Sequence, residues 1–208
     1  MKAKTLLIAA AALAATVISS EAQVYSQNVV GYVNVSLPAG QLVLLSNPLD
    51  DGTNTVTSLG AALANKSTVQ IWNGTGYTAS SKGAGVWTTN LSIPVGTGFF
   101  VKSQTAITNT FVGNVVPFSG ISITNSLPAG QLVLVGSTVP FSGGNLTDTN
   151  VNIGPSLANK STIQVWNGTG FTASSKGAGV WTTNLSLAVA QGFFVKSQTA
   201  ASWVQTAP

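Results

Sequence analysis

The sequence predicts an all-β protein, and three observations lead to that prediction. The 208 residues are 44% hydrophobic and only 6% charged, with 22 glycines, a composition typical of folded, turn-rich β proteins. Val, Thr and Trp recur in short runs that turn residues interrupt. After the N-terminal segment, no window of useful length carries apolar residues at the 3.6-residue spacing of an amphipathic helix. We therefore expect β-sandwich or barrel-like units.

The first 22 residues have the pattern of an export signal. Lys2 and Lys4 give a positive start, an apolar run covers residues 6–18, and Ser20 and Ala22 are small residues suited to a cleavage site. The alternative is an uncleaved anchor, but the run of about 13 apolar residues is short for a membrane-spanning helix. We expect cleavage after Ala22. The mature chain would lack a transmembrane segment and would be secreted or held at the cell envelope.

The mature chain consists of two copies of one unit. Residues 63–106 recur at 157–200 with seven differences in 44 positions, and residues 36–44 recur at 126–134. Because the offset grows from 90 to 94 residues, the second copy carries a four-residue insertion within 136–156. Near the ends, Phe111-Val112 resembles Trp203-Val204. We place β repeat 1 at residues 23–113 and β repeat 2 at residues 114–208.

Within repeat 1, short apolar or β-branched runs predict the strands in order. The runs at residues 69–72 and 77–79 are separated by Asn73 to Gly76. This spacing predicts a hairpin, because Asn-Gly accepts the positive φ of tight turns. Residues 56–64 have room for a helical turn. The expected strands are 30–35, 41–46, 69–72, 77–79, 85–89, 98–103 and 108–113.

One of these strands is apolar at every position. Leu42 to Leu45 and the matching Leu132 to Val135 do not alternate, so both faces of this strand should be covered. A sandwich covers one face of each sheet. The second face could be covered by the other repeat, packed through a roughly two-fold interface, or by loops of the same repeat. We favour the first arrangement.

Two motifs carry a resemblance to other proteins. W-N-G-x-G-[YF] stands at residues 72–77 and 166–171, and G-F-F-V at residues 98–101 and 192–195. Together with NVVGYVNVSLPAGQLVLLSNPL at the start of repeat 1, they resemble a repeat of exported environmental bacterial proteins without an assigned activity. The resemblance covers nearly all of the mature chain. It implies export and β architecture, and it transfers no catalytic residue.

The inventory of reactive side chains argues against an enzyme. The chain has no His, Cys or Arg, and the mature part keeps three acids, Asp50, Asp51 and Asp148, at positions that do not match between the repeats. Serine-lysine dyads are formally available at Ser81-Lys82 and Ser103-Lys102, but neighbouring residues of a strand rarely face each other. We expect no catalytic residue and no cofactor.

Two loops are candidate ion sites. Asp148 to Asn152 places oxygen ligands at alternate positions, as in a calcium loop, but Ile153 stands where a glycine is needed and Asn159 where an acid is needed. Residues 80–85 could cradle an anion on backbone amides, but they lack the spacing of a phosphate-binding loop. A solvated turn and a plain loop are the favoured interpretations, so we expect no metal site.

Aromatic residues give the best-founded hint of binding. If Val69 and Ile71 face the core, Trp72 faces the opposite side and lies across the turn from Tyr77. Flat rings flanked by amides and hydroxyls suit a sugar-stacking platform. The alternatives are that the rings cover the core or form a protein interface. The candidate platform comprises Trp72, Tyr77, Trp87, Trp166, Phe171 and Trp181.

The remaining surface chemistry favours a structural role. Six lysines against three aspartates give the mature chain a net charge of about +3, which is too small to indicate nucleic acid. Uncharged strands rich in Thr, Asn and Val can pair edge to edge. We expect a non-catalytic structural or adhesive protein of the bacterial envelope or matrix, with self-assembly through strand edges. A carbohydrate-binding protein with polysaccharide as its partner is the alternative.

Overall fold

The computed structural model describes residues 30–116, 122–139 and 143–206. The protein is 50% strand and 5% helix, with several antiparallel sheets, which confirms the prediction of an all-β, sandwich-like fold. The expected export signal at residues 1–22 lies outside the described residues. The signal and its cleavage site therefore stay predictions.

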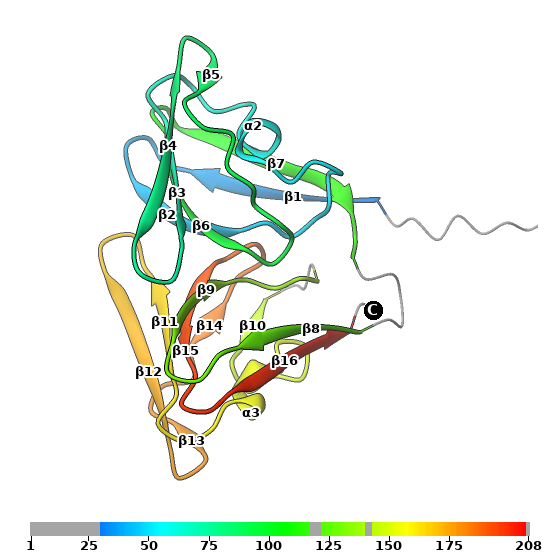
Figure 1. Ribbon diagram of the computed structural model, residues 1–208, viewed down its shortest axis with the longest axis vertical. Coiled ribbons are helices and arrows are strands. Elements are labelled where there is room, and N and C mark those ends of the chain that lie inside the picture. The colour runs from blue at the N-terminus through cyan, green and yellow to red at the C-terminus, as the bar shows by residue number, and fades with distance from the viewer. Residues whose placement is uncertain (1–29, 117–121, 140–142, 207–208) are drawn as a thin grey trace, which may run out of the picture.

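Repeat 1 consists of a five-stranded antiparallel sheet and a two-stranded one (Figure 1). The order in the larger sheet is β2-β6-β3-β4-β5, and β1 pairs with β7. The short helix α2 lies within residues 56–64, where the sequence has room for a helical turn. The elements are β1 (Val30–Leu37), β2 (Leu42–Ser46), α2 (Val56–Leu59), β3 (Thr68–Trp72), β4 (Tyr77–Gly83), β5 (Val86–Trp87), β6 (Gly98–Lys102) and β7 (Ile107–Asn114).

Repeat 2 has the corresponding sheets and one additional short pair. Its larger sheet has the order β9-β15-β11-β12-β13, β8 pairs with β16, and β10 pairs with β14. The elements are β8 (Ser122–Leu127), β9 (Leu132–Val135), β10 (Gly144–Asn145), α3 (Ile153–Ser156), β11 (Thr162–Trp166), β12 (Phe171–Gly177), β13 (Val180–Trp181), β14 (Ser186–Leu187), β15 (Phe193–Lys196) and β16 (Ala201–Thr206).

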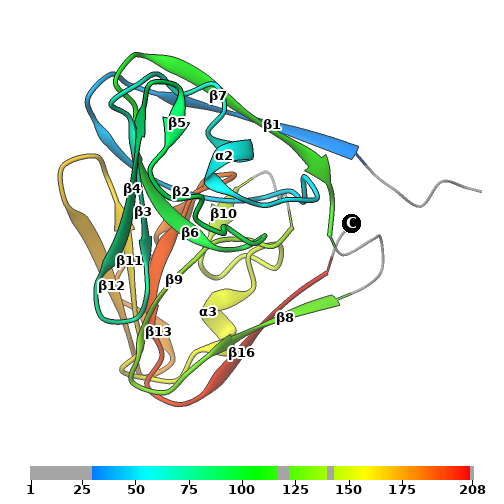
Figure 2. The same cartoon turned by 45° about the horizontal axis from the view of Figure 1, so that its top comes forward.

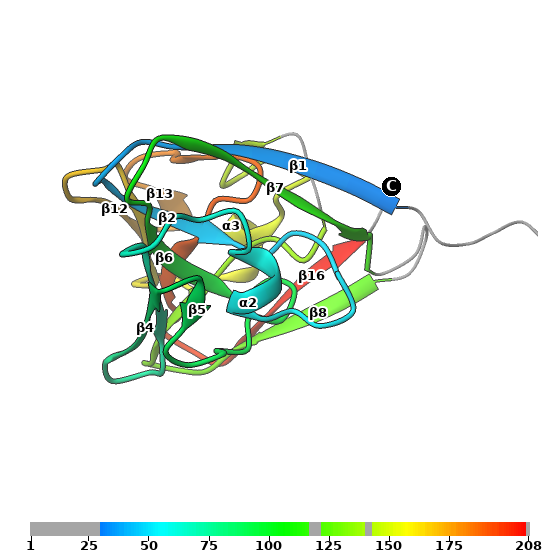
Figure 3. The same ribbon diagram turned by 90° about the horizontal axis from the view of Figure 1, so that it is seen from above.

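A separate hydrophobic core lies in each repeat, between the larger sheet and the strand pair. Period-two alternation builds it: Val33 and Leu37 of β1 point inward, and the residues between them are half-buried or exposed. Figure 3 shows α2 between the β1–β7 pair and the β4–β5 end of the sheet. Burial of each large aliphatic side chain contributes about 1.5–3 kcal/mol to folding.

The outer faces of the two larger sheets meet in a third core, the interface cluster. Its buried members are Leu44 and Phe100 from repeat 1 with Leu134 and Phe194 from repeat 2. Figures 1 and 2 show the β3–β4 and β11–β12 hairpins extending towards the opposite repeat. The second face of the all-apolar strand is therefore covered by the other repeat and not by its own loops. The two-fold relation between the repeats stays a prediction.

Backbone hydrogen bonds also join the repeats at the ends of β2 and β9. Ser46 N donates to Ala190 O (2.8 Å), and Gly136 N donates to Gly96 O (2.8 Å). The two backbone segments approach so closely that a Cβ on Gly192 would overlap the backbone oxygen of Leu45. Only glycine fits at such a contact.

Equivalent hydrogen bonds locate the insertion of repeat 2. Val56 N donates to Leu91 O and Leu146 N donates to Leu185 O, so Val56 corresponds to Leu146. Gly60 corresponds to Gly154, because their carbonyls accept from Lys82 and Lys176. The four extra residues therefore fall within 147–153, inside the interval 136–156 that the offsets predicted.

The strand registers correct one detail of the sequence alignment. Leu37 pairs with Ile107, and its counterpart Leu127 pairs with Ala201. Counting along the strands, Asn109 corresponds to Trp203 and Phe111 to Gln205. The predicted match of Phe111 with Trp203 was wrong by two residues. Because burial in a strand has a period of two, a shift of two residues leaves the inward face unchanged and cannot be detected from the hydrophobic pattern.

Candidate functional site

Twin hairpins carry the aromatic residues of the candidate platform. In the first, the Asn73 side-chain oxygen accepts hydrogen bonds from Thr75 N (3.1 Å) and Gly76 N (2.8 Å), which closes the turn. Asn167 makes the same bonds to Thr169 N and Gly170 N. The turn fixes the register in which Trp72 lies opposite Tyr77. The hairpin and its aromatic pair therefore have the arrangement expected from the sequence.

Trp72 and Trp166 lie partly buried where the two repeats meet. The indole Nε1 of Trp72 donates to the backbone oxygen of Leu132 (2.9 Å), and that of Trp166 donates to Leu42 O (2.7 Å). Each tryptophan thus satisfies an edge carbonyl of the other repeat. Both side chains face away from their own core, as expected, but the neighbouring repeat covers that face.

Around these two residues the rings pack edge to face. Trp72 lies 5.7 Å from Phe194, and Trp166 lies 5.8 Å from Phe100, measured between ring centroids. Aromatic pairs at such spacing contribute about 0.5–1.5 kcal/mol beyond the area they bury. The rings therefore stabilise the contact between repeats.

Tyr77 and Phe171 are the exposed members of the aromatic group. Their exposed fractions are 46% and 43%, although each ring also contacts a tryptophan of its own hairpin. Partial burial raises the pKa of the Tyr77 phenol above its usual value. These two rings are accessible to a ligand at their outer edges.

Trp87 and Trp181 do not belong to a surface platform. Each is only 7% exposed and packs in the hydrophobic core of its repeat. The strand that carries each residue is two residues long and follows a tight turn, which directs the indole inward. The six aromatics therefore divide into two core residues, two residues at the repeat junction and two partly exposed ones.

Lys82 of one candidate dyad and its repeat 2 counterpart Lys176 both donate to the chain's own carbonyls. The ammonium group of Lys82 donates to Ala61 O and Leu63 O (both 2.8 Å), and that of Lys176 donates to Leu157 O (2.7 Å). Ser103 Oγ donates to Thr105 O (2.6 Å). These bonds direct Lys82 away from Ser81 and give Ser103 a structural partner.

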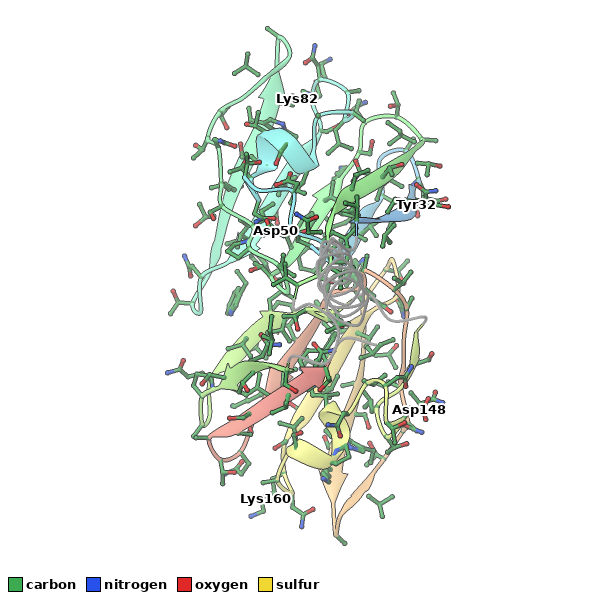
Figure 4. All side chains as sticks on the ribbon, turned by 90° about the vertical axis from the view of Figure 1, so that its right-hand side faces the viewer. Tyr32, Asp50, Lys82, Asp148 and Lys160 are labelled. Atoms are coloured by element: carbon green, nitrogen blue, oxygen red, sulfur yellow. The ribbon has the colours of Figure 1, made fainter. Side chains whose placement is uncertain are left out.

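The three acids likewise bond to their own loops. Asp50 Oδ1 accepts from Gly52 N (2.9 Å), and Asp148 Oδ2 accepts from Asn145 N (2.7 Å). Figure 4 shows Asp50 and Asp148 on different halves of the molecule, so the two loops do not form a composite site. Among the described residues, no group of three His, Cys, Asp or Glu side chains could hold a metal ion.

The other candidate ion site is not the plain loop that the sequence favoured, because residues 80–83 belong to β4 and only residues 84–85 form the tight β4–β5 turn. Positive φ angles at Ala84 (48°) and Gly85 (81°) are typical of a type I′ hairpin. Gly85 N donates to the side-chain oxygen of Asn65 (2.7 Å), and Gly179 N makes the same bond to Asn159. One of the amides that could contact an anion is therefore already bonded.

One feature was missed by sequence reasoning, a cleft of about 380 Å³ between the repeats. Its walls come from β1, β2 and the Pro38–Gln41 turn in repeat 1 and from the Trp166–Gly168 turn and residues 188–191 in repeat 2. Besides Trp166 of the predicted platform, the sequence signal at this place was the all-apolar strand β2. It indicated a contact between repeats and gave no indication of a gap in that contact.

Comparison with protein-family models, with curated proteins and with solved structures gave no match. In the described part of the chain, no helix has the length and apolar character needed to cross a membrane. The function of this two-repeat β protein is therefore argued from the chemistry of its own surfaces.

Proposed function

We propose that this protein is an exported, non-catalytic structural or adhesive component of the bacterial cell envelope or extracellular matrix. The observation that supports this most directly is a pair of identical hairpin tips. Residues 80–90 and 174–184 have the same sequence, SSKGAGVWTTN, and form the β4–β5 and β12–β13 hairpins. Figure 1 shows β5 and β13 at opposite ends of the long axis.

Each tip carries an exposed apolar side chain on an edge strand. Val86 is 70% exposed and Val180 is 69% exposed, and β5 and β13 end their five-stranded sheets. Identical surfaces can associate with one another through a self-complementary contact. A rigid molecule with such a surface at each end can join copies into a chain.

The hydrogen bonds that reactive side chains make within the chain agree with a structural role. Lys82, Asp50 and Asp148 bond to the chain's own backbone. Two of the tryptophans join the repeats. The surface left for contacts consists mainly of neutral strands and turns, which suits association with other neutral surfaces.

The test is the assembly state of the mature protein and of tip variants, measured by sedimentation velocity over a range of concentrations. We expect the wild type to form chains, V86D or V180D alone to stop at dimers, and the double variant to stay monomeric. A charge placed in each contact is strongly disfavoured because it loses hydration without gaining a partner.

The matched control is Val112→Asp, which places the same charge on another exposed valine, away from the tips. It should assemble as the wild type does. A wild type that stays strictly monomeric at high concentration, or a V112D variant that loses assembly equally, would overturn the proposal.

The second candidate function is carbohydrate binding. The observation that favours it is that Trp166 lines the cleft between the repeats together with amide side chains. This differs from the six-residue platform, because only one of those six aromatics contributes to the cleft.

A further inference from the structure

The cleft between the repeats is the concave surface on which the carbohydrate-binding candidate rests. It lies beside β2, where Trp166 closes one wall and residues 188–191 close another. A volume of about 380 Å³ is within the range of small-ligand sites, about 300–1,000 Å³. It is large enough for one or two sugar rings.

Apolar groups form most of the lining. Val35, Leu42 and Val43 contribute aliphatic carbon from repeat 1, and Val189 contributes it from repeat 2. The polar atom of Trp166 is already used, because Nε1 donates to Leu42 O (2.7 Å). The indole therefore offers the cleft only its aromatic carbon surface.

Two amide side chains at the cleft are oriented by bonds to their oxygens. Asn167 Oδ1 accepts from Thr169 N and Gly170 N, and Gln191 Oε1 accepts from Ala188 N (2.8 Å). Within the described part of the chain, neither NH2 group has a hydrogen-bond partner. Both remain as donors for a ligand, and the hydroxyl of Ser36 and the amide of Gln41 add further polar groups.

Among the described residues, no charged side chain lines the cleft. A charged ligand would lose hydration there without an ionic partner, which is costly. A suitable ligand is neutral, offers acceptor oxygens to the two NH2 groups, and packs C–H surface against Trp166 and the aliphatic wall. We propose that this cleft binds a neutral saccharide of one or two rings.

The twin junction supplies a comparison within the same molecule. There Thr97 takes the place of Gln191, Pro94 that of Ala188, and Asn125 that of Val35. The Gln191 donor and the Val35 side chain are thus present on one side only. We therefore expect a single site per chain.

Isosteric variants test the donors without removing the bonds that hold the loops. N167D and Q191E keep the accepting oxygen and replace the NH2 donor by a second, negative acceptor. N73D is the matched control, because Asn73 closes the same turn in repeat 1 with the same bonds and does not line the cleft.

Binding is measured on the mature protein by NMR titration with cellobiose, maltose and N,N′-diacetylchitobiose. We expect at least one disaccharide to shift the amide signals of Gln41, Asn167 and Gly168. N167D and Q191E should each weaken that binding by about tenfold or more, the loss expected for one hydrogen bond in a neutral site, and N73D should not change it.

Several outcomes would overturn the proposal: no shift with any of the three sugars, equal loss in N73D and N167D, or undiminished binding in N167D and Q191E. Preferential binding of a neutral peptide such as hexaglycine would assign the cleft to a protein segment instead. Because the tips and the cleft share no residue, failure here is distinguishable from failure of the assembly proposal.

Discussion

The β1–β7 and β8–β16 pairs each cover the core of their repeat, but they fill the inward positions with different residues. In β7 the inward positions hold Asn109 and Phe111, and the corresponding positions of β16 hold Trp203 and Gln205. The large ring has moved by one inward position along the strand. The polar side chain occupies the other position in each repeat.

This exchange is coupled to the loops above each core. Trp203 Nε1 donates to Val151 O (2.7 Å), and Val151 belongs to the segment that contains the insertion. Gln205 accepts from Thr138 N (2.9 Å) and donates to Ser137 Oγ (2.7 Å), which fixes the loop after β9.

In repeat 1 the corresponding loop is held by its backbone. Asp50 N donates to Asn114 O (2.9 Å), and Asn114 N donates to Asp50 O (2.8 Å). The corresponding residue in repeat 2 is Pro140, which has no N–H to donate. The insertion and the shifted aromatic ring of repeat 2 are coupled through the bond from Trp203 to Val151.

The largest effect is expected from a substitution that disrupts this arrangement in repeat 2. Trp203→Ala should lower the free energy of unfolding by about 3–5 kcal/mol, measured by urea denaturation, because it leaves a large cavity. Trp203→Phe should lower the free energy of unfolding by only about 1 kcal/mol for the lost hydrogen bond, with a small further loss from packing, because an aromatic ring still fills the site. Phe111→Ala should cost less than Trp203→Ala, because no indole hydrogen bond is lost.

The control for this comparison is Val204→Ala, on the exposed side of the same strand. Its effect should stay within about 0.5 kcal/mol, as for most surface substitutions. If Trp203→Ala costs no more than Val204→Ala, the assignment of Trp203 as the central core residue of repeat 2 is wrong.

A second effect compares Lys82, which is buried, with its counterpart Lys176, which is partly buried. Lys82 donates to three carbonyls and Lys176 to two, so Lys82→Met should destabilise the protein by about 2 kcal/mol and Lys176→Met by somewhat less. Methionine keeps the aliphatic length, which isolates the loss of the ammonium group. Denaturation curves of the exposed Lys102→Met variant give the reference, and equal losses in all three would contradict this role.

The strands could be predicted because their signals are local. Alternation of Val33 and Leu37 and the Asn-Gly turn at residue 73 depend only on neighbours along the chain. The unbroken apolar run at Leu42 also indicated a contact between the repeats, because a strand apolar on both faces needs two partners.

The candidate site could not be predicted to the same degree, because it depends on distant contacts. Trp72 faces outward from its own core, but only the position of the other repeat decides whether that face is free. The donors of Asn167 and Gln191 meet β2 of a different repeat at the cleft. Sequence alignment also missed the two-residue shift of the ring at Trp203, since either alignment keeps the same face inward.

The smallest effect concerns Asp51, which lies in a loop of repeat 1 whose acids have no counterpart at the matching positions of repeat 2. Partial burial acts to raise the pKa of Asp51, but hydrogen bonds from nearby hydroxyl and backbone N–H groups outweigh burial and lower the pKa below its usual value. Asp51 Oδ1 accepts from Thr53 N (2.8 Å), from Thr53 Oγ1 (3.0 Å) and from Asn54 N. These bonds favour the ionised form in the folded chain.

A lowered pKa means that Asp51 contributes stability above the pKa of the unfolded chain, about 3.9, and loses it as the pH falls through the folded value. The stability difference between wild type and Asp51→Asn should be constant from pH 7 to 5 and shrink below about pH 4. It should stay under about 1 kcal/mol, because the carboxylate is partly solvated. Thr53→Val, which removes one of the three bonds, should reduce this pH dependence without abolishing it. A wild-type advantage that grows as the pH falls would show that Asp51 is held in its protonated form, and the loop would then need a different account.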